Sequence, residues 1–261
     1  MTRFRIATYN IHKGRGLDGR VRIERIARVL EEIDADVVAL QEVVSHEGAS
    51  VEDHQASYLA DRFGYVHAVG ETRKHRGGVY GNVTLSRWPF ELIRHIDLSV
   101  PGREERCVLR TDLRVSSHLL HIFNVHLGTA HRERRTQAVR LIDEDLLRAI
   151  DISGPRIVLG DFNEWTHGLA TRTLSAEFHL TDLRDHVRRT RAYPAIVPLL
   201  HLDHIYFDHQ LKIQNAEFHR NRRSLIASDH LPLVADLIFS DHASRLHDPA
   251  AHDLAITRDK S

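Results

Sequence analysis

Residues 158–165 read VLGDFNEW, an apolar run that stops at Gly160 and then sets Asp161 and Asn163 on either side of a phenylalanine. The apolar residues predict a buried strand at 156–160. Asp and Asn close many turns by bonding the neighbouring backbone, which is the simplest explanation of a single polar strand end. The meaning of Asp161 and Asn163 therefore depends on how the other strands end.

Other apolar runs in the chain also end on acids or amides. The runs at 4–9 and 36–40 are followed by such residues, and ASDHLPL at 227–233 sets them before another apolar run. The polar residues at the four ends are Asn10, Glu42, Asp161, Asn163, Asp229 and His230. If the strands lie side by side, these side chains converge on one rim. Hard oxygen ligands suit Mg²⁺ or Mn²⁺ better than zinc, so we expect a divalent metal site there.

Histidines join the acids at these strand ends. His126 closes the apolar run at 118–127, and His230 stands beside Asp229. Asp203 lies inside an apolar strand, where a carboxylate without a partner would be costly. Pairing Asp203 with a ring nitrogen of His230 would fix the tautomer of the imidazole and raise its basicity, as in enzymes that orient a general base.

Helices and strands alternate along the chain, which predicts an α/β fold in one domain. Amphipathic helices are predicted at 22–33 and 134–150, where apolar residues recur at helical spacing. Strands are predicted at 4–9, 36–40, 83–86, 106–115, 118–127, 156–160, 203–207 and 232–239. The domain is expected to span 1–240, and 241–261 predicts a flexible C-terminal extension because it lacks sustained periodicity.

The charge balance excludes a strong overall attraction to polyanions. The chain has 36 Lys and Arg against 36 Asp and Glu, so no net field draws it to nucleic acid or an anionic membrane. Its single cysteine, Cys107, excludes an internal disulfide. No signal-peptide pattern opens the sequence, and no run reaches the roughly 18 to 20 apolar residues of a membrane span. We expect a cytoplasmic protein that does not span the membrane, with no obligate protein partner evident.

Seven short motifs follow one another between Asn10 and Leu233. They read YNIH, LQEV, GNVTLSR, NVHLG, GDFN, LDHI and SDHLPL. In this order they resemble the motif series of the endonuclease/exonuclease/phosphatase superfamily, which has the DNase I-like fold. The resemblance implies a four-layer α/β sandwich with two central mixed β-sheets flanked by helices. It also implies a Mg²⁺-dependent hydrolase of phosphate esters, with Mn²⁺ as a substitute metal.

The resemblance assigns roles to the acids and amides at the rim. Glu42 is implied as the main metal ligand, with Asn10 close to it and Asp229 contributing from the other side. Asp161 and Asn163 are implied to face the attacking water and the scissile phosphate. These roles match the chemistry, because hydrolysis of an anionic diester needs a cation on its oxygens, an oriented water and donors at the developing charge.

The histidines and two further residues are implied to act on the phosphate. His230, held by Asp203, is implied as a general base or as a hydrogen-bond donor to the transition state, and both alternatives stay open. His126 is implied to bond a phosphate oxygen or to assist the leaving group. Asn82 and Arg106 are weaker candidates for phosphate contacts, and a structural salt bridge is an equal alternative for Arg106.

The loops between the motif strands carry basic segments. These segments lie at 73–76, 131–135, 184–191 and 219–223. Each alone is typical of a solvated loop, and together they favour a polyanion or an anionic head group as the substrate. The apolar stretch that includes Tyr193 and Ile196 precedes Asp203, so it either lines the substrate groove or packs into the core.

The substrate class stays open at this stage. PLLHLDHI at 198–205 lacks the tryptophan of abasic-site endonucleases and the CDR element of inositol polyphosphate 5-phosphatases. The leading prediction is a metal-dependent phosphodiesterase that acts as a nuclease. The first alternative is a phospholipid or small-molecule phosphodiesterase or phosphatase, and the second is a catalytically idle binding module.

Overall fold

The computed structural model describes residues 2–45, 48, 50–75, 78–142, 146–164, 168–177, 180–187 and 191–240. The predicted extension at 241–261 lies outside the described residues, as do Arg76 and 188–190 of the basic segments. Within the described part, no helix is long and apolar enough to cross a membrane.

The first sheet has six strands in the order β11-β12-β1-β2-β4-β3. Its strands are β1 (Arg3–Asn10), β2 (Val37–Ser45), β3 (Val66–His75), β4 (Gly78–Ser86), β11 (Leu211–Phe218) and β12 (Leu233–Phe239). β1 and β2 are parallel, and the other pairs are antiparallel. The parallel pair lies in the middle of the sheet, where continuous apolar runs fit strands covered on both faces.

The second sheet has six strands in the order β5-β6-β7-β8-β10-β9. Its strands are β5 (Phe90–Asp97), β6 (Cys107–Val115), β7 (His118–His126), β8 (Arg156–Asp161), β9 (Thr181–Asp182) and β10 (Asp203–Phe207). β7 and β8 form the parallel pair, and the remaining pairs are antiparallel. Both sheets are therefore mixed, with a parallel pair at their centres.

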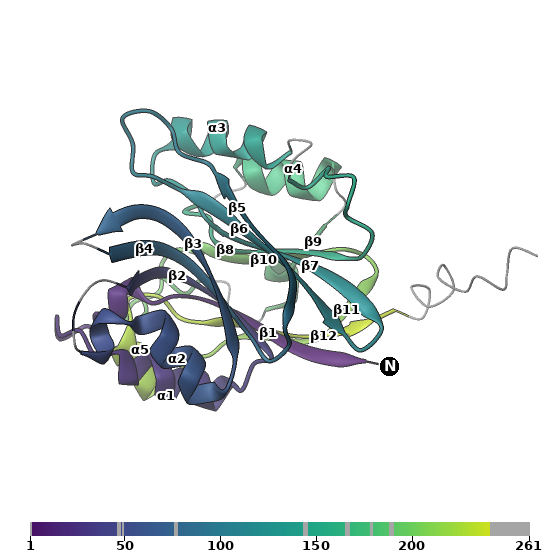
Figure 1. Cartoon of the computed structure of the whole chain (residues 1–261). Helices are drawn as coiled ribbons and strands as arrows, with labels where there is room; N and C mark the ends of the chain where they lie inside the picture. Colours follow the sequence, from purple (N-terminus) through teal and green to yellow (C-terminus); the bar gives the residue numbers. More distant parts are fainter. Residues whose placement is uncertain are drawn as a thin grey trace, which may run out of the picture.

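The two sheets pack face to face, and helices cover their outer sides (Figure 1). α1 (Ile23–Ile33), α2 (Gln55–Phe63) and α5 (Arg222–Ala227) lie on the first sheet, and α3 (His131–Leu141) and α4 (Leu169–Glu177) lie over the second. One apolar cluster fills the space between the sheets, and two others fill the spaces under the helices. The predicted four-layer α/β sandwich is confirmed.

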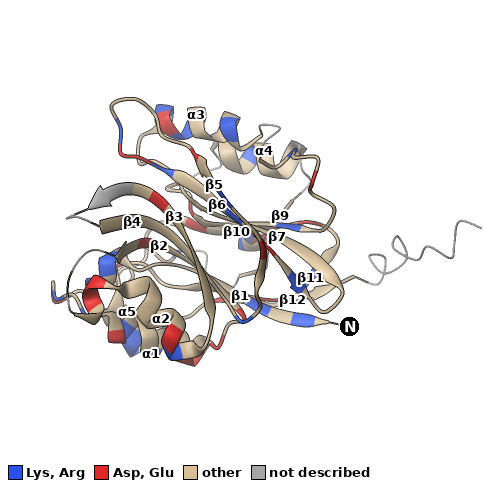
Figure 2. Ribbon diagram, viewed as in Figure 1, with Lys and Arg blue, Asp and Glu red and all other residues tan. Residues whose placement is uncertain are grey.

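Charged residues lie mainly on the outside of these layers. Figure 2 shows both signs on α1 and α2 and several basic residues on α3. The helix predicted at 134–150 begins at His131 and ends at Leu141, so the prediction was too long. Three acidic residues follow at 143–145 in the sequence, and negative charge is unfavourable at the C-terminal end of a helix.

Candidate active site

The polar strand ends form a row that joins the two sheets. His126 at the end of β7 is aligned with Asp161 of β8, and Asp161 is aligned with Asp203 of β10. Asn10 ends β1 in the first sheet, and Glu42 lies in the parallel neighbour β2. Asn10 Nδ2 lies 3.0 Å from Asp161 Oδ2 and 3.3 Å from Glu42 Oε1. Of the residues expected at the rim, Asn10, Glu42 and Asp161 from two sheets are therefore in contact.

The turn after β8 explains why its apolar run stops at a glycine. Gly160 has a φ of 144°, and a Cβ atom there would collide with the carbonyl oxygen of Val125. Asn163 has a φ of 50°, a left-handed conformation that asparagine tolerates. Its backbone N–H donates to Asp161 Oδ1 at 2.9 Å, and Phe162 between them is fully buried. These contacts hold the Asp161 carboxylate at a rigid strand end.

Asp161 Oδ2 faces three nitrogen atoms. Besides Asn10 Nδ2, these are His126 Nε2 at 3.6 Å and His230 Nε2 at 3.7 Å. The residue is 2% exposed, and this burial raises the pKa of Asp161 to about 6 against the opposing effect of His230. A carboxyl group with this pKa can accept a proton near neutral pH.

Asp203 orients the imidazole of His230. Its Oδ2 lies 2.8 Å from His230 Nδ1, the contact that the sequence predicts, and both side chains are buried. Burial alone would lower the pKa of His230, but the carboxylates of Asp203 and Asp161 raise it to about 10. His230 therefore carries a proton on Nε2 at neutral pH. The other oxygen of Asp203, Oδ1, is buried without a hydrogen-bond partner among the described residues.

A β-bulge in β2 sets the direction of Glu42. The register of β2 against β4 shifts between Leu40 and Val43, and Glu42 has a φ of 58°. Its Oε2 lies 3.0 Å from Lys13 Nζ. Burial alone would raise the pKa of Glu42, but the neighbouring His126 and Lys13 lower it to about 2. Glu42 is therefore a charged carboxylate that already faces a cation.

Asp229 lies on the other side of Asn10. Its Oδ1 is 3.4 Å from His12 Nδ1 and 3.4 Å from Ser228 Oγ. Ser228 Oγ also donates to the carbonyl oxygen of Asn10 at 2.9 Å. In the described part of the chain, no hydrogen bond or ion pair joins Asp229 to Glu42. The structure therefore brings Asn10 and Glu42 into contact and connects Asp229 to them through Ser228.

His126 and Arg106 are neighbours at the end of the second sheet. Burial, together with the nearby guanidinium of Arg106, keeps the pKa of His126 well below its usual value, so its imidazole is neutral at pH 7. Arg106 Nη2 lies 3.0 Å from Glu104 Oε2, the alternative salt bridge. Its Nε and Nη1 atoms are buried with no hydrogen-bond partner among the described residues. Unpaired buried N–H groups are costly, so these two atoms are suited to an anionic oxygen.

The side-chain amides of Asn82 and Asn163 donate to backbone carbonyl oxygens near the site. Asn82 Nδ2 donates to the carbonyl oxygens of Cys107 at 3.1 Å and Asn124 at 3.3 Å. Asn163 Nδ2 donates to the carbonyl oxygen of Leu127 at 2.9 Å. Within the described residues, the Asn82 side chain makes no hydrogen bond to the acids of the rim. Asn82 therefore joins the two sheets behind the site.

Three residues that contact the site were not singled out in the sequence. His12 and Lys13 directly follow the YNI of the first motif, and Ser228 directly precedes Asp229. His12 and Lys13 have positive φ angles of 46° and 60°, which aim their side chains at the two acids. A basic residue just after an expected metal ligand is the signal that would have found His12 and Lys13, and no comparable signal marks Ser228.

The apolar loop before β10 lies against His230. The ring centroids of Tyr193 and His230 are 4.6 Å apart. Ile196, Val197 and Leu199 are 57%, 60% and 59% exposed. These three side chains are exposed, whereas Ala192 and Ala195 of the same loop are fully buried in an apolar cluster with Leu231, so part of the loop packs into the core.

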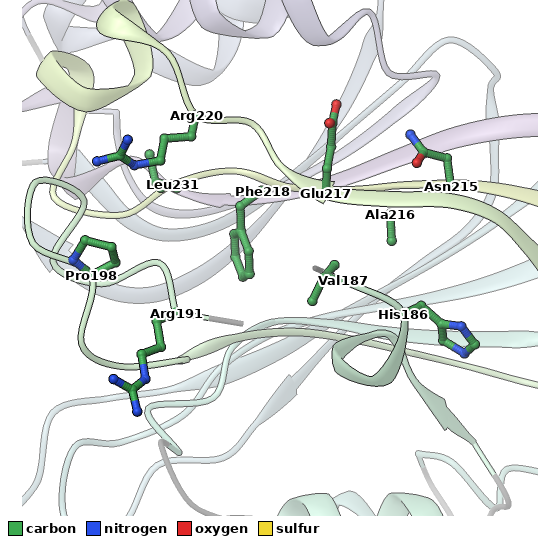
Figure 3. Close-up of a pocket in the computed structure, with 10 residues that line it drawn as sticks. All are labelled: His186, Val187, Arg191, Pro198, Asn215, Ala216, Glu217, Phe218, Arg220 and Leu231. Atoms are coloured by element: carbon green, nitrogen blue, oxygen red, sulfur yellow. The ribbon is translucent and has the colours of Figure 1, made fainter. Parts of the chain in front are cut away.

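Two of the basic segments meet at a cavity of about 870 Å³ (Figure 3). Arg191 comes from the segment at 184–191 and Arg220 from the segment at 219–223, while Phe218 supplies apolar surface. Leu231 of the lining follows His230, and Pro198 belongs to the loop of Tyr193. The cavity therefore adjoins the backbone that carries His230. The segment at 131–135 opens α3, and the side chains at 73–76 lie outside the described ones.

Comparisons with known proteins find relatives of similar sequence and similar fold. The uncharacterized Escherichia coli protein YbhP is 32% identical over 247 residues, which cover 90% of this chain and 96% of YbhP. The crystal structure of an endonuclease/exonuclease/phosphatase from Beutenbergia cavernae matches with a TM-score of 0.75 at 26% identity, over 92% of this chain and 72% of that one.

A mannosyl-6-phosphatase from Bacteroides thetaiotaomicron shares the fold, with a TM-score of 0.73 at 16% identity. The match covers 90% of this chain and 100% of that one. The model of the endonuclease/exonuclease/phosphatase family matches residues 7–242. Members of this family are phosphoesterases and usually depend on a divalent metal. The chain therefore belongs to the endonuclease/exonuclease/phosphatase family.

Proposed function

We propose that this chain is a Mg²⁺-dependent phosphodiesterase, in which water attacks the phosphorus atom of the ester. One observation carries the proposal: Asn10, Glu42 and Asp161 from two sheets meet beside the Asp203–His230 pair. Burying so many polar and charged groups costs stability, and the packing of the sheets does not require it. Membership of a phosphoesterase family supports the class of reaction.

The residues at the rim fit a hard divalent cation. Glu42, Asn10 and Asp229 would hold it, because they offer carboxylate and amide oxygens. The low pKa of Glu42 and its contact with Lys13 support this fit, since the carboxylate is charged and attracts a cation. When bound, Mg²⁺, or Mn²⁺ as its substitute, supplies positive charge to the phosphate oxygens.

Asp161 and His230 are the proposed proton carriers. Asp161 takes a proton from the attacking water as the new P–O bond forms, which its pKa of about 6 permits. His230 donates its Nε2 proton to the leaving oxygen as the ester P–O bond breaks, since its pKa of about 10 keeps it protonated. The 3.7 Å between Asp161 Oδ2 and His230 Nε2 allows the proton to return to the imidazole afterwards. Asp203 fixes the ring that makes this donation.

His126 and Arg106 are the proposed phosphate contacts. A neutral His126 can donate one ring N–H to a phosphate oxygen without repelling the metal. The unpaired N–H groups of Arg106 would find in the substrate the anionic acceptor that the described protein does not supply. Asn163, next to Asp161, is proposed to help place the attacking water.

Nucleic acid is the leading substrate class, and a phospholipid or other small diester is the second. The basic residues around the cavity of Figure 3 favour an additional anionic group, as nucleic acid provides. The exposed Ile196, Val197 and Leu199, in the loop whose Tyr193 contacts His230, favour an apolar moiety, as a lipid provides. A salt series separates them, because a substrate held through several phosphates loses affinity steeply as salt rises.

Hydrolysis of bis-p-nitrophenyl phosphate and of p-nitrophenyl phosphate, each in Mg²⁺, Mn²⁺ and EDTA, tests the proposal. We expect the wild type to cleave the diester faster and only with metal, and Glu42→Ala to lose about 10²-fold or more in rate. Glu91→Ala is the matched control, because Glu91 pairs with Arg114 on the surface of the second sheet. Undiminished hydrolysis in EDTA or by Glu42→Ala contradicts the proposal. A preference for the monoester makes the chain a phosphatase, and no hydrolysis favours the idle binding module.

A further inference from the structure

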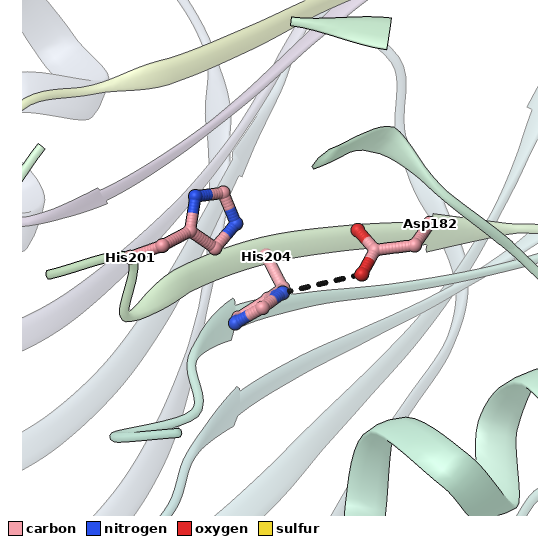
Figure 4. A group of neighbouring side chains, drawn as sticks. All are labelled: Asp182, His201 and His204. Carbon is pink, nitrogen blue, oxygen red and sulfur yellow. Dashed lines mark ion pairs between the residues drawn. The ribbon is translucent and has the colours of Figure 1, made fainter. Parts of the chain in front are cut away.

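A second group of metal-ligand side chains lies at the β9 edge of the second sheet (Figure 4). Asp182 belongs to β9, His204 to β10, and His201 to the segment just before β10. His204 follows Asp203, and successive side chains of a strand point to opposite faces, so the group lies on the other face of β10 from the Asp203–His230 pair. The exposed fractions of Asp182, His201 and His204 are only 8%, 2% and 1%.

The distances within the group suit ligands of one ion. One ring nitrogen or carboxylate oxygen from each residue lies within 4.8 Å of the other two. Asp182 Oδ2 is 3.6 Å from His204 Nδ1, and the rings of His201 and His204 cross at 78° with centroids 4.3 Å apart. A separation of 3.6 Å exceeds an ordinary N–H···O hydrogen bond. It is close to the roughly 3.3 Å between two ligands that each lie about 2 Å from a tetrahedral ion.

Neighbouring groups orient two of the three ligands. His204 Nε2 lies 3.2 Å from the carbonyl oxygen of Glu164, so it donates there and leaves the lone pair of Nδ1 toward Asp182. The backbone N–H of Arg184 donates to Asp182 Oδ1 at 2.9 Å, which leaves Oδ2 toward His204. The Tyr206 hydroxyl lies 3.2 Å from His204 Nδ1, and an ion would take its place there. Such outer contacts are typical of histidine and carboxylate ligands in metal sites.

We propose that Asp182, His201 and His204 bind one transition-metal ion, with Zn²⁺ as the best match. Two neutral imidazoles and one carboxylate are donors that Zn²⁺ favours. The rim, in contrast, offers the oxygen donors that suit Mg²⁺. Three protein ligands leave a fourth position of a tetrahedral ion to solvent. The chain would therefore bind two kinds of metal at separate places.

This ion stabilises the segment that carries part of the active site. β9 is only two residues long, so few ladder hydrogen bonds hold it to β10. The ion would join β9 to the segment before β10. That segment runs from Tyr193, beside the ring of His230, to Asp203, which orients His230. Metal at this place acts through the fold and touches no substrate.

The test measures metal content, thermal stability and the visible spectrum of the Co²⁺-substituted protein, using the full chain stripped with EDTA. The measurements are made on the Asp161→Asn variant. This substitution weakens the other group that could hold a metal ion, which is formed by Asp161, Asp203 and His230. After Zn²⁺ is added back to the stripped chain, we expect one equivalent to survive dialysis and to raise Tm by about 5 to 10 °C at a hundredfold excess over Kd. Co²⁺ should give the visible bands of a tetrahedral site.

Substitutions locate the bound ion. His201→Gln should lose the retained Zn²⁺, the rise in Tm and the Co²⁺ bands, while the control His219→Gln, at a partly buried histidine that pairs with Glu32, keeps all three. If His201→Gln does not fold, Asp182→Asn is measured instead, because an amide oxygen can still accept from Arg184. Equal metal content in the wild type and these variants, or no retained metal in the wild type, would overturn the proposal. Glu42→Ala separates this proposal from the proposed function. It should lose phosphodiesterase activity and still retain Zn²⁺.

Discussion

Two networks of acids, histidines and arginines, buried except for Asp151, lie at opposite ends of β7 and β8. They differ in how completely their buried polar atoms are paired. The catalytic-end network contains Asp161, Asp203, His230, His126 and Arg106. The Arg110 network contains Arg110, Asp112, His121 and Asp151. Both use the same residue types, so the difference in pairing indicates what each network is for.

The Arg110 network is saturated with short contacts. Arg110 donates to both oxygens of Asp112, at 3.0 and 2.7 Å, and to Asp151 at 2.9 Å. His121 Nδ1 lies 2.9 Å from Asp112 Oδ1, and His121 Nε2 accepts from the backbone N–H of Gly154 at 3.1 Å. Among the described residues, no buried side-chain nitrogen or oxygen of Arg110, Asp112 or His121 lacks a hydrogen-bond partner. A paired network of this kind holds strands together and offers little to a ligand.

The catalytic-end network is incompletely paired. Asp203 Oδ1 and two nitrogens of Arg106 are buried without hydrogen-bond partners among the described residues. The contacts of Asp161 with His126 and His230 are 3.6 and 3.7 Å, longer than hydrogen bonds. Buried polar groups are rarely left in this state without a reason. The comparison teaches that incomplete pairing, and not the residue types, separates the network proposed to be functional from the structural one.

The largest expected effect is the loss of activity in His230→Ala, and its absence would contradict the comparison. We expect diester hydrolysis to fall by about 10²- to 10⁴-fold, because the proposed proton donor is removed. Tm should change far less than the rate. Rates of the purified variant with Mg²⁺, beside its thermal unfolding, measure both. A variant that turns over like the wild type would exclude His230 from the chemistry.

Arg110→Met should show the opposite behaviour. Removing Arg110 leaves the buried Asp112 charge without its main partner, so we expect a loss of about 3 to 5 kcal/mol of stability. For a chain of this size, Tm would fall by roughly 2 to 4 °C for each kcal/mol. Urea denaturation measures the change. Arg114→Met is the matched control on the same strand, because its pair with Glu91 is exposed and its loss should leave the stability nearly unchanged.

A smaller effect, the acid sensitivity of the Arg110 network, would sharpen the comparison. Burial alone would raise the pKa of Asp112, but His121 and Arg110 lower it below its usual value. A depressed carboxyl pKa contributes stability that is present above the unfolded pKa of about 4 and lost as the pH falls through the folded value. We expect the stability gap between the wild type and Asp112→Asn to be full at pH 7 and to shrink below about pH 4. A gap of constant size across a series of urea titrations would contradict this.

The sequence predicts the middle of each sheet and misses the edges. The four strands that were not predicted, β3, β5, β9 and β11, are the four edge strands of the two sheets. β5 reads FELIRHID and β11 reads LKIQNAEF, and their side chains alternate between more and less exposed positions. An edge strand needs no continuous apolar run, and β9 is too short to give any pattern. Backbone pairing with a neighbour, which sequence patterns do not record, defines these strands.

In the candidate site, too, some contacts can be predicted from the sequence and others cannot. The contact of Asp203 with His230 follows from residue chemistry, because a buried carboxylate needs a partner. The contact of Lys13 with Glu42 depends on backbone conformation, since Lys13 and Glu42 both have positive φ angles. No glycine marks the bulge at Glu42 in the sequence, and Gly14, which follows Lys13, does not indicate that Lys13 itself has a left-handed conformation. Such geometry becomes visible only in the folded chain.

One experiment tests the central claim most directly: the same substitution in each network, Asp161→Asn and Asp112→Asn, measured for diester hydrolysis with Mg²⁺ and for Tm in EDTA. Burial raises the pKa of Asp161, so its charge costs stability at neutral pH and the amide should leave Tm equal or higher. We predict that Asp161→Asn loses about 10²-fold or more in rate without a lower Tm. Asp112→Asn should lower Tm and keep the wild-type rate. The reverse pattern, or the same pattern in both variants, would contradict the account.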